Sequence, residues 1–338
     1  MKSLKERSEH VKNFRVIGLD ISKDEIIGCI EKIGIKAFKN DHEGIKELIK
    51  ISQEEPTIIG LEPTGPYHKK CEELMGKAGI EVVIINPLNT KRSKEMLDNS
   101  PSKNDAKDAM IIKELVERGY YLKPIKREGI YRKLQEGHVC LCRINKEMTR
   151  KRNELHAAER GAVMGEKERR WLVQDIIKLN KHCKIIEKEL ERYMEEVPYE
   201  DSLKSIPQLG KITIARILGE TGDLMQYKGA ESVISVSGLK LYNKESGHKK
   251  GQTHITKRGR PELRRLLFMA TLRMIKKEGV MRERYLRIKG NGKSNIEALV
   301  ACARALVRIM LAIAKKGETY KIGNQGGTGI IKGIHEAA

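Results

Sequence analysis

Short apolar runs separated by polar turns predict β-strands at the start of the chain. The runs cover residues 16–20, 26–30, 33–38, 57–62 and 81–85. Apolar residues at helical spacing predict helices over residues 41–49, where Asp41 is placed to cap the first turn, and over residues 67–78. The order βββαβα(β)α, with the last strand followed by one more helix, predicts a mixed sheet flanked by helices and therefore an α/β fold.

A heptad repeat dominates residues 125–200 and predicts two long helices joined by a turn near Gly161 and Gly165. Its positions are Leu134, Leu141, Met148 and Leu155, then Leu172, Leu179, Ile186 and Tyr193, with Ile176, Cys183, Leu190 and Val197 as a second seam. The two helices could pair within one chain or between chains. Either way we expect a structural arm that sets the geometry of subunit assembly.

The last third of the chain is helical and basic. Residues 205–211 lead into a helix and resemble a helix-hairpin-helix, in which Gly210 and Lys211 offer backbone N–H groups to a phosphate. Residues 240–293 contain 17 Lys or Arg against 4 Glu, a balance of +13, and glycines interrupt them before a helix predicted over residues 263–274. Such a loop suits a phosphate backbone. Its candidate contacts are Lys249, Lys250, Lys257, Arg258 and Arg264.

Composition narrows the class of partner. The 338 residues carry a net charge of +21, which indicates a polyanion, and nucleic acid before a membrane. Aromatic residues are only 4% of the chain, so we expect stacking on bases to contribute little to nucleic-acid binding. The longest apolar run, residues 296–314, carries Glu297, Arg304 and Arg308, so we expect a buried amphipathic helix and no membrane span. The charged first residues lack the apolar segment of a secretory signal.

The six cysteines show no CxxC spacing. Cys140 and Cys142 lie near His138, but side chains two apart on a helix diverge, which argues against a metal site there. Reduced thiols are expected instead of a zinc site or a disulfide framework.

Four acids are candidates for a metal site. Asp20 and Glu62 end the first and fourth predicted strands, and Asp105 and Asp108 lie three apart at the start of a helix. By itself the last pair could simply complement the helix dipole. Together, the four could hold a pair of Mg²⁺ ions about 3.5–4 Å apart for phosphoryl transfer. Their order resembles the RuvC-like branch of the RNase H fold, whereas a proofreading exonuclease would have Glu where Ser22 stands.

Several motifs extend this resemblance over residues 14–320. They are Gly-Leu-Asp20, Glu62-Pro-Thr-Gly, Asn86-Pro, Lys103-Asn-Asp105-Ala-Lys-Asp108-Ala, Ile206-Pro-Gln-Leu-Gly210, Gly238-Leu, Ser246-Gly247 and Ile255-Thr-Lys-Arg-Gly259. Through these motifs the chain resembles the DEDD transposases of insertion-sequence family 110, which are relatives of the Piv-type DNA invertases. Asn104 stands where Thr is common, and Leu241 replaces a usual proline.

The resemblance implies a recombinase in the prokaryotic cytoplasm, at the nucleoid. It implies a RuvC-like catalytic domain (residues 1–124), a coiled-coil arm (125–200), a small, mostly helical transposase domain (201–322) and a flexible tail (323–338). The family's acids fall on Asp20, Glu62, Asp105 and Asp108, which would bind Mg²⁺ or Mn²⁺, and its nucleophilic serine falls on Ser246. Implied partners are donor and target double-stranded DNA, a bridge RNA encoded by the element that pairs with both, and further copies of the chain, as a dimer or an active tetramer.

Two other classes remain open from the residues alone. A metal-dependent nuclease such as a Holliday-junction resolvase would need the acids but not Ser246, which otherwise reads as a turn residue. In a non-catalytic nucleic-acid-binding protein the acids would be structural.

Overall fold

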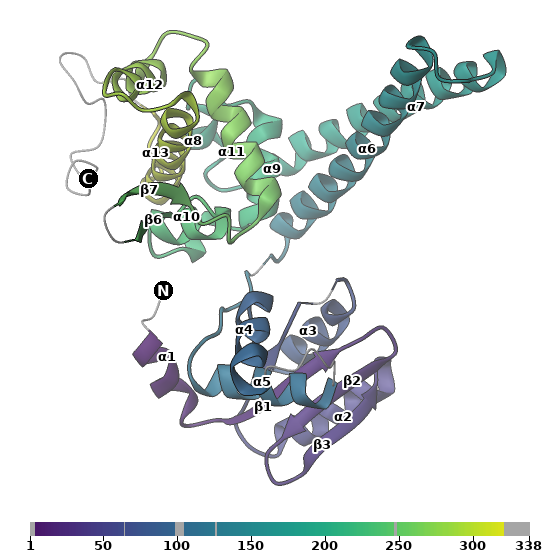
Figure 1. Cartoon of the computed structure of the whole chain (residues 1–338), viewed down its shortest axis with the longest axis vertical. Helices are drawn as coiled ribbons and strands as arrows, with labels where there is room; N and C mark the ends of the chain where they lie inside the picture. Colours follow the sequence, from purple (N-terminus) through teal and green to yellow (C-terminus); the bar gives the residue numbers. More distant parts are fainter. Residues whose placement is uncertain (1–3, 64, 99–104, 126, 247–248, 321–338) are drawn as a thin grey trace. The chain divides into compact units, whose positions relative to one another are not determined.

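The computed structural model describes residues 4–63, 65–98, 105–125, 127–246 and 249–320, without the side chains of residues 97, 98, 243–246 and 249–253. The tail predicted at 323–338 lies outside the described residues. The chain divides into two compact units, residues 1–125 and 126–338 (Figure 1). The division into three domains stays a prediction.

A five-stranded mixed sheet forms the centre of the first unit, in the order β3-β2-β1-β4-β5 (Figure 1). Its strands are β1 (Arg15–Ile21), β2 (Glu25–Ile30), β3 (Gly34–Lys39), β4 (Thr57–Leu61) and β5 (Glu81–Ile84). The first three strands form an antiparallel meander, and β1, β4 and β5 are parallel. This confirms the predicted α/β class and is compatible with an RNase H-like transposase fold.

Helices cover both faces of this sheet, so β1 is buried on both sides. Ile17, Leu19 and Ile21 pack against α2 (His42–Gln53) and α3 (His68–Lys77). On the opposite face, Val16 packs with residues of α1 (Leu4–Val11) and α5 (Asp105–Glu117). Asp41 caps α2 as predicted, with its carboxylate accepting a hydrogen bond from the Gly44 N–H at 2.8 Å. The sequence analysis predicted neither α1 nor the helix α4 (Pro87–Asp98) of this unit.

The second unit begins with the two predicted long helices, α6 (Ile130–Glu159) and α7 (Glu166–Met194). They lie side by side and antiparallel within the chain, and Figure 1 shows their connected ends extending away from the other helices of the unit. Leu134, Leu141 and Met148 of the predicted seam are buried, and so are Cys183 and Leu190 opposite them. Pairing between chains stays a prediction.

The rest of the second unit is a helical bundle around its last helix. The bundle contains α8 (Glu200–Lys204), α9 (Lys211–Thr221), α10 (Ala230–Ser237), α11 (Pro261–Met274), α12 (Val280–Gly290) and α13 (Asn295–Lys316). A 3₁₀ turn lies at Leu224–Gln226. α13 begins with a capping box, in which Ser294 and Glu297 each bond the other's backbone N–H. This buried amphipathic helix matches the one expected over residues 296–314.

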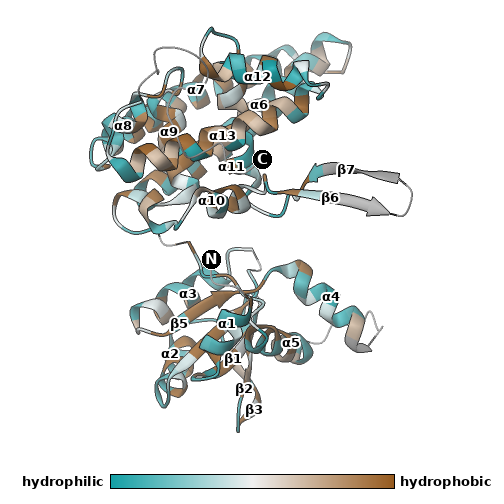
Figure 2. Ribbon diagram, turned by 90° about the vertical axis from the view of Figure 1, so that its left-hand side faces the viewer, coloured by the Kyte–Doolittle hydropathy of each residue, from teal (hydrophilic) through white to brown (hydrophobic). Residues whose placement is uncertain are grey.

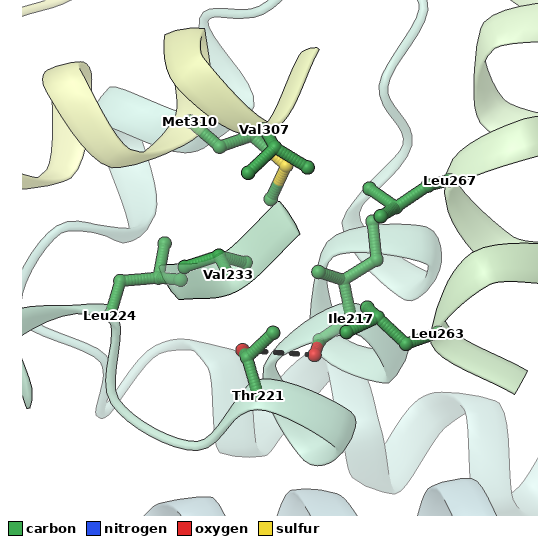
Figure 3. Close-up of a pocket in the computed structure, with 8 residues that line it drawn as sticks. All are labelled: Ile217, Thr221, Leu224, Val233, Leu263, Leu267, Val307 and Met310. Atoms are coloured by element: carbon green, nitrogen blue, oxygen red, sulfur yellow. Dashed lines mark hydrogen bonds between the residues drawn. The ribbon is translucent and has the colours of Figure 1, made fainter. Parts of the chain in front are cut away.

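The core of this bundle leaves one small apolar cavity of about 10 Å³, shown in Figure 3. Leu224, Val233 and Met310 line it, and Thr221 lies beside them with its hydroxyl donating to the Ile217 carbonyl at 3.0 Å. Such a space is too small for a ligand. None of the described helices is long and apolar enough to cross a membrane.

A β-hairpin replaces the glycine-rich loop that the sequence analysis predicted around residue 246. β6 (Leu241–Ser246) and β7 (Lys249–Ile255) pair antiparallel with a register shift between Lys244 and Ser246. The hairpin projects from the helices of its unit (Figure 2). The prediction of a loop was wrong because backbone hydrogen bonds form this ladder, and few apolar or β-branched side chains mark it in the sequence.

Candidate active site

Two glycines bring α5 onto the sheet. Gly18 of β1 and Gly60 of β4 are cross-strand partners beneath this helix. A Cβ on Gly18 would lie 2.2 Å from the Ala109 carbonyl oxygen, and one on Gly60 would lie 2.4 Å from a methyl group of Val116. No side chain fits at either position, so the two glycines fix how closely α5 approaches the strands.

Strand register then aligns two of the acids. Leu19 of β1 pairs in parallel with Leu61 of β4, so the next residues, Asp20 and Glu62, are neighbours at the same edge of the sheet. Side chains alternate along a strand, so Asp20 shares the face of Gly18, and Glu62 continues that of Gly60. Both acids therefore belong to the face that α5 covers.

Three carboxylates converge where α5 begins. Asp20, Asp105 and Asp108 each bring an oxygen to within 4.8 Å of the others. Asp105 is the first residue of α5, and Asp108 lies one turn further along the same face. Glu62 is close enough that its charge acts on Asp20. The structure thus brings together the four acids singled out in the sequence.

The electrostatics of Asp20 reflect this crowding. Burial raises the pKa of its carboxyl from the usual 3.8, and the negative charges of Asp108, Asp105 and Glu62 raise it further, to about 6. The Lys94 ammonium acts in the opposite direction. A carboxyl whose pKa is raised by neighbouring carboxylates is poised to bind a cation, which would remove the repulsion.

Lys94 is a site residue that the sequence analysis missed. It belongs to the unpredicted helix α4, and its ammonium contacts both carboxylate oxygens of Asp108, at 2.6 Å from Oδ2. The Lys94 ammonium already places one positive charge beside these acids. The acids therefore accommodate a cation, which supports their fit to a divalent ion. Nothing local distinguishes Lys94 from the other cations of α4, so no sequence pattern could have found it.

The candidate phosphate contacts of the second unit differ in their surroundings. Lys211 is held in ion pairs with Glu195 and Glu200 at 3.3 and 3.0 Å. Arg264 donates to the carbonyl oxygens of Ser237 and Lys257 at 3.1 and 3.4 Å, which closes a corner of the fold.

Other candidates in that unit are more open. Gly210, which caps the start of α9, is exposed, as are Lys257 and Arg258. Ser246 is the last residue of β6, where its backbone pairs with Lys249. The side chains of Ser246, Lys249 and Lys250 lie outside the described part of the structure.

A second polar cluster lies at the base of the arm. His138 and Cys142 share a face of α6, and their ligand atoms lie within 4.8 Å of a Glu262 oxygen. The Arg216 Nε–H donates to His138 Nδ1 at 3.2 Å, and Glu220 lies 3.1 Å from His138 Nε2. Both ring nitrogens are occupied, so this cluster is a polar network and does not offer a histidine ligand to a metal.

Two models of known families match the chain. A model of DEDD transposases, described as a transposase, matches residues 17–161, and the model of the transposase IS116/IS110/IS902 family matches residues 200–286. The chain belongs to the IS116/IS110/IS902 family of transposases. The first match contains all four acids, and the second contains Ser246 and the basic residues around it.

Relatives of this transposase chain are distant but some match along most of their length. The transposase of insertion sequence IS1111A from Coxiella burnetii is 24% identical over 94% of each chain. A pilin gene-inverting protein from Moraxella lacunata is 23% identical, over 90% of this chain and 97% of its own. The protein of insertion element IS116 from Streptomyces clavuligerus is 28% identical over 45% of this chain, and the match spans only 39% of that relative. For the IS110 protein of Streptomyces coelicolor the match spans 37%.

Proposed function

We propose that this family member is a DNA recombinase that cuts and rejoins strands with a metal-dependent site formed by Asp20, Glu62, Asp105 and Asp108. The observation that carries the proposal is the convergence of three carboxylates at the start of α5, with the fourth acid directly after the adjacent strand β4. The full-length likeness to a transposase and to pilin gene-inverting proteins supports strand exchange over simple cleavage.

The acids would hold Mg²⁺ or Mn²⁺, since hard carboxylate oxygens suit both ions. Bound there, the metal would polarise the phosphoryl oxygens and lower the pKa of an attacking hydroxyl. Asp20 keeps enough acidity, with a pKa of about 6, to be mostly ionised near neutral pH. Lys94 would release Asp108 and remain near a bound phosphate, where its positive charge would attract the phosphate oxygens.

Ser246 is proposed as the nucleophile. Its Oγ would attack the phosphorus and pass its proton to a base, and one ester oxygen of the strand would leave as a free hydroxyl after protonation. The resulting phosphoserine diester would conserve the phosphodiester energy until a second strand's hydroxyl attacks it. Ser246 lies in a different unit from the acids, so this site would be composite, formed within one chain or across two subunits.

The composite site would make cleavage depend on assembly if the serine acts across subunits. The paired helices of the arm would hold the subunits, as a dimer or as a tetramer in the active complex. Donor and target DNA would be selected by a guide RNA through base pairing, while the protein, with its net charge of +21, holds the phosphate backbones.

The decisive experiment uses Ser246→Ala and Asp105→Ala proteins with labelled donor and target DNA, Mg²⁺ and the element's RNA. We expect Ser246→Ala to lose the covalent protein–DNA adduct on a denaturing gel while DNA and RNA binding change less than about twofold. A mixture of the two variants should regain part of the cleavage if the site is shared between subunits.

Three outcomes would count against this assignment. A Ser246→Ala protein that still releases free DNA ends would indicate a nuclease that uses water, such as a resolvase. Unchanged strand exchange in Asp105→Ala would remove the acids from the chemistry altogether. RNase treatment that leaves site selection intact would exclude the guide RNA.

A further inference from the structure

Three arginines gather where α12 packs against α13. Arg304 and Arg308 are one turn apart on α13, and Arg284 comes from α12. The Nε atoms of Arg284 and Arg304 are buried, and neither has a hydrogen-bond partner among the described residues. A buried N–H of a charged group normally has an acceptor, so each of these two groups requires an explanation.

Positive charge prevails in this arginine cluster, formed by Arg284, Arg304 and Arg308. Among the described residues its one ion pair joins Arg308 to Glu231 of α10 at 2.6 Å, and the Glu231 side chain is 63% exposed. Burial lowers the pKa of the Arg284 and Arg304 guanidinium groups, and the charge of Arg308 lowers both further. Three cations therefore share one exposed carboxylate.

Two arginines elsewhere in the chain, the buried Arg15 and the partly buried Arg260, are well paired. Arg15, with a side chain only 5% exposed, contacts Glu54 and Glu55 and donates to the Thr57 hydroxyl and the Ile51 carbonyl. Arg260 is paired with Glu220 at 3.1 Å. The arginine cluster differs from these structural arginines because its acceptors are incomplete among the described residues of its unit.

We propose that Arg284, Arg304 and Arg308 form a site for phosphodiester groups of a nucleic-acid backbone. The inference rests on the proposed function, which requires the chain to hold DNA and RNA, and adds residues beyond the candidate phosphate contacts named from the sequence. Guanidinium groups from two helices supply several fixed N–H donors, which match phosphate oxygens.

Spacing along α13 also favours a backbone over an isolated anion. Lys315 lies two turns beyond Arg308, on the same side of the helix, and its ammonium reaches the Lys228 carbonyl at 2.8 Å. From Arg304 to Lys315 the helix rises about 16 Å, which is enough to follow several phosphates of one strand.

The test measures binding of a labelled duplex DNA and a single-stranded RNA of the same sequence to the full chain, over a series of salt concentrations. We expect Arg284→Gln and Arg304→Gln each to weaken binding about tenfold and to reduce the slope of log affinity against log salt by about 1. Loss with RNA alone, or with DNA alone, identifies which backbone occupies the cluster.

Two further variants keep the test valid if the glutamine variants unfold. Glu231→Gln removes the competing acceptor from an exposed position, so binding should tighten about twofold to threefold. Arg282→Gln is the matched control, because it removes the same charge from the same helix but points away from Arg284, about 200° around the axis. Its binding should remain within about twofold of the original protein.

The outcomes separate this inference from the proposed function. Original protein that binds neither probe would contradict the proposed function itself. Folded Arg284→Gln and Arg304→Gln proteins that bind both probes as the original does would overturn the arginine cluster alone. A lower melting temperature with unchanged binding would likewise overturn it, since acids from elsewhere would then be the partners of these arginines.

Discussion

Charged side chains gather in two contrasting places: an acid cluster in the first unit (Asp20, Glu62, Asp105 and Asp108) and the polar network at the base of the arm. Only in the polar network do opposite charges balance one another. In the second unit Glu220 lies between His138 and Arg260, at 3.1 Å from each. Burial acts to raise the pKa of the Glu220 carboxyl, but these two partners lower it to about 2. In the first unit the same kind of group, Asp20, has its pKa raised to about 6 by burial and by other acids.

The difference teaches how to separate structural charges from functional ones in this fold. A carboxylate whose pKa falls in its site has its stabilising partners within the protein. Around a carboxylate whose pKa rises, the protein disfavours the charged form. The rest of the fold keeps the group in place, and a stabilising partner arrives only with a ligand. Carboxylates with a lowered pKa should therefore matter for stability, and carboxylates with a raised pKa should matter for activity.

The largest expected effect is on activity, from Asp108→Asn. Losing one carboxylate of the acid cluster should reduce strand exchange by at least about 10³-fold, because charge stabilisation at a phosphoryl group is usually a large catalytic term. The variant relieves the repulsion of Asp20 but also takes the counter-charge from Lys94, so the melting temperature should change little. The control is Glu114→Gln on the same helix, an acid ion-paired with Arg118, which should retain activity.

Gly18→Ala should break the geometry that forms the acid cluster. The new Cβ would lie 2.2 Å from the Ala109 carbonyl, so α5 must shift or the sheet must open. We expect a loss of about 3 kcal/mol or more in the free energy of unfolding, measured by chemical denaturation. Gly76→Ala is the control: no atom lies within 4 Å of its added Cβ, and this helical site should become more stable by about 0.5–1 kcal/mol. Equal stability of the two variants would contradict the close approach of α5.

Glu220→Gln should have the opposite profile to Asp108→Asn. Removing this charge leaves His138 and Arg260 without their buried counter-charge, and we expect a loss of about 2–3 kcal/mol in the free energy of unfolding. At a temperature where the variant is fully folded, strand exchange should stay within about threefold of the original. A loss of activity without a loss of stability would place Glu220 in the chemistry and erase the contrast.

The smallest effect concerns pH and Asp20. The folded protein without metal binds a proton at Asp20 up to a pH of about 6, whereas the unfolded carboxyl releases it near its usual 3.8. Stability contributed by this group is therefore lost as pH rises from about 4 to about 6, by about 1 kcal/mol after allowing for solvent screening.

Melting temperatures in EDTA across this pH range would measure the loss, and Asp20→Asn should flatten the curve. Added Mg²⁺ should reverse the slope, because the ion binds the ionised carboxylates. An unchanged slope in Asp20→Asn would show that other groups govern this range.

The sequence by itself determined the parts that depend on local patterns. Short apolar runs bounded by polar turns predicted the strands around Asp20, and helical spacing predicted α5 with Asp105 and Asp108 on one face. Heptads predicted the two long helices of the arm, because a seam must repeat in register with the helix. These patterns also located the four acids and, through the motifs, the family.

Only the tertiary structure decided what depends on contacts distant along the chain. The strand order and the Gly18–Gly60 pair bring the acids together, and α4 brings Lys94 to Asp108. The hairpin whose first strand ends at Ser246 forms by backbone pairing, and few of its side chains indicate a strand in the sequence. The arginine cluster is defined by missing acceptors, and an unpaired charge becomes visible only when all of its neighbours in space are known.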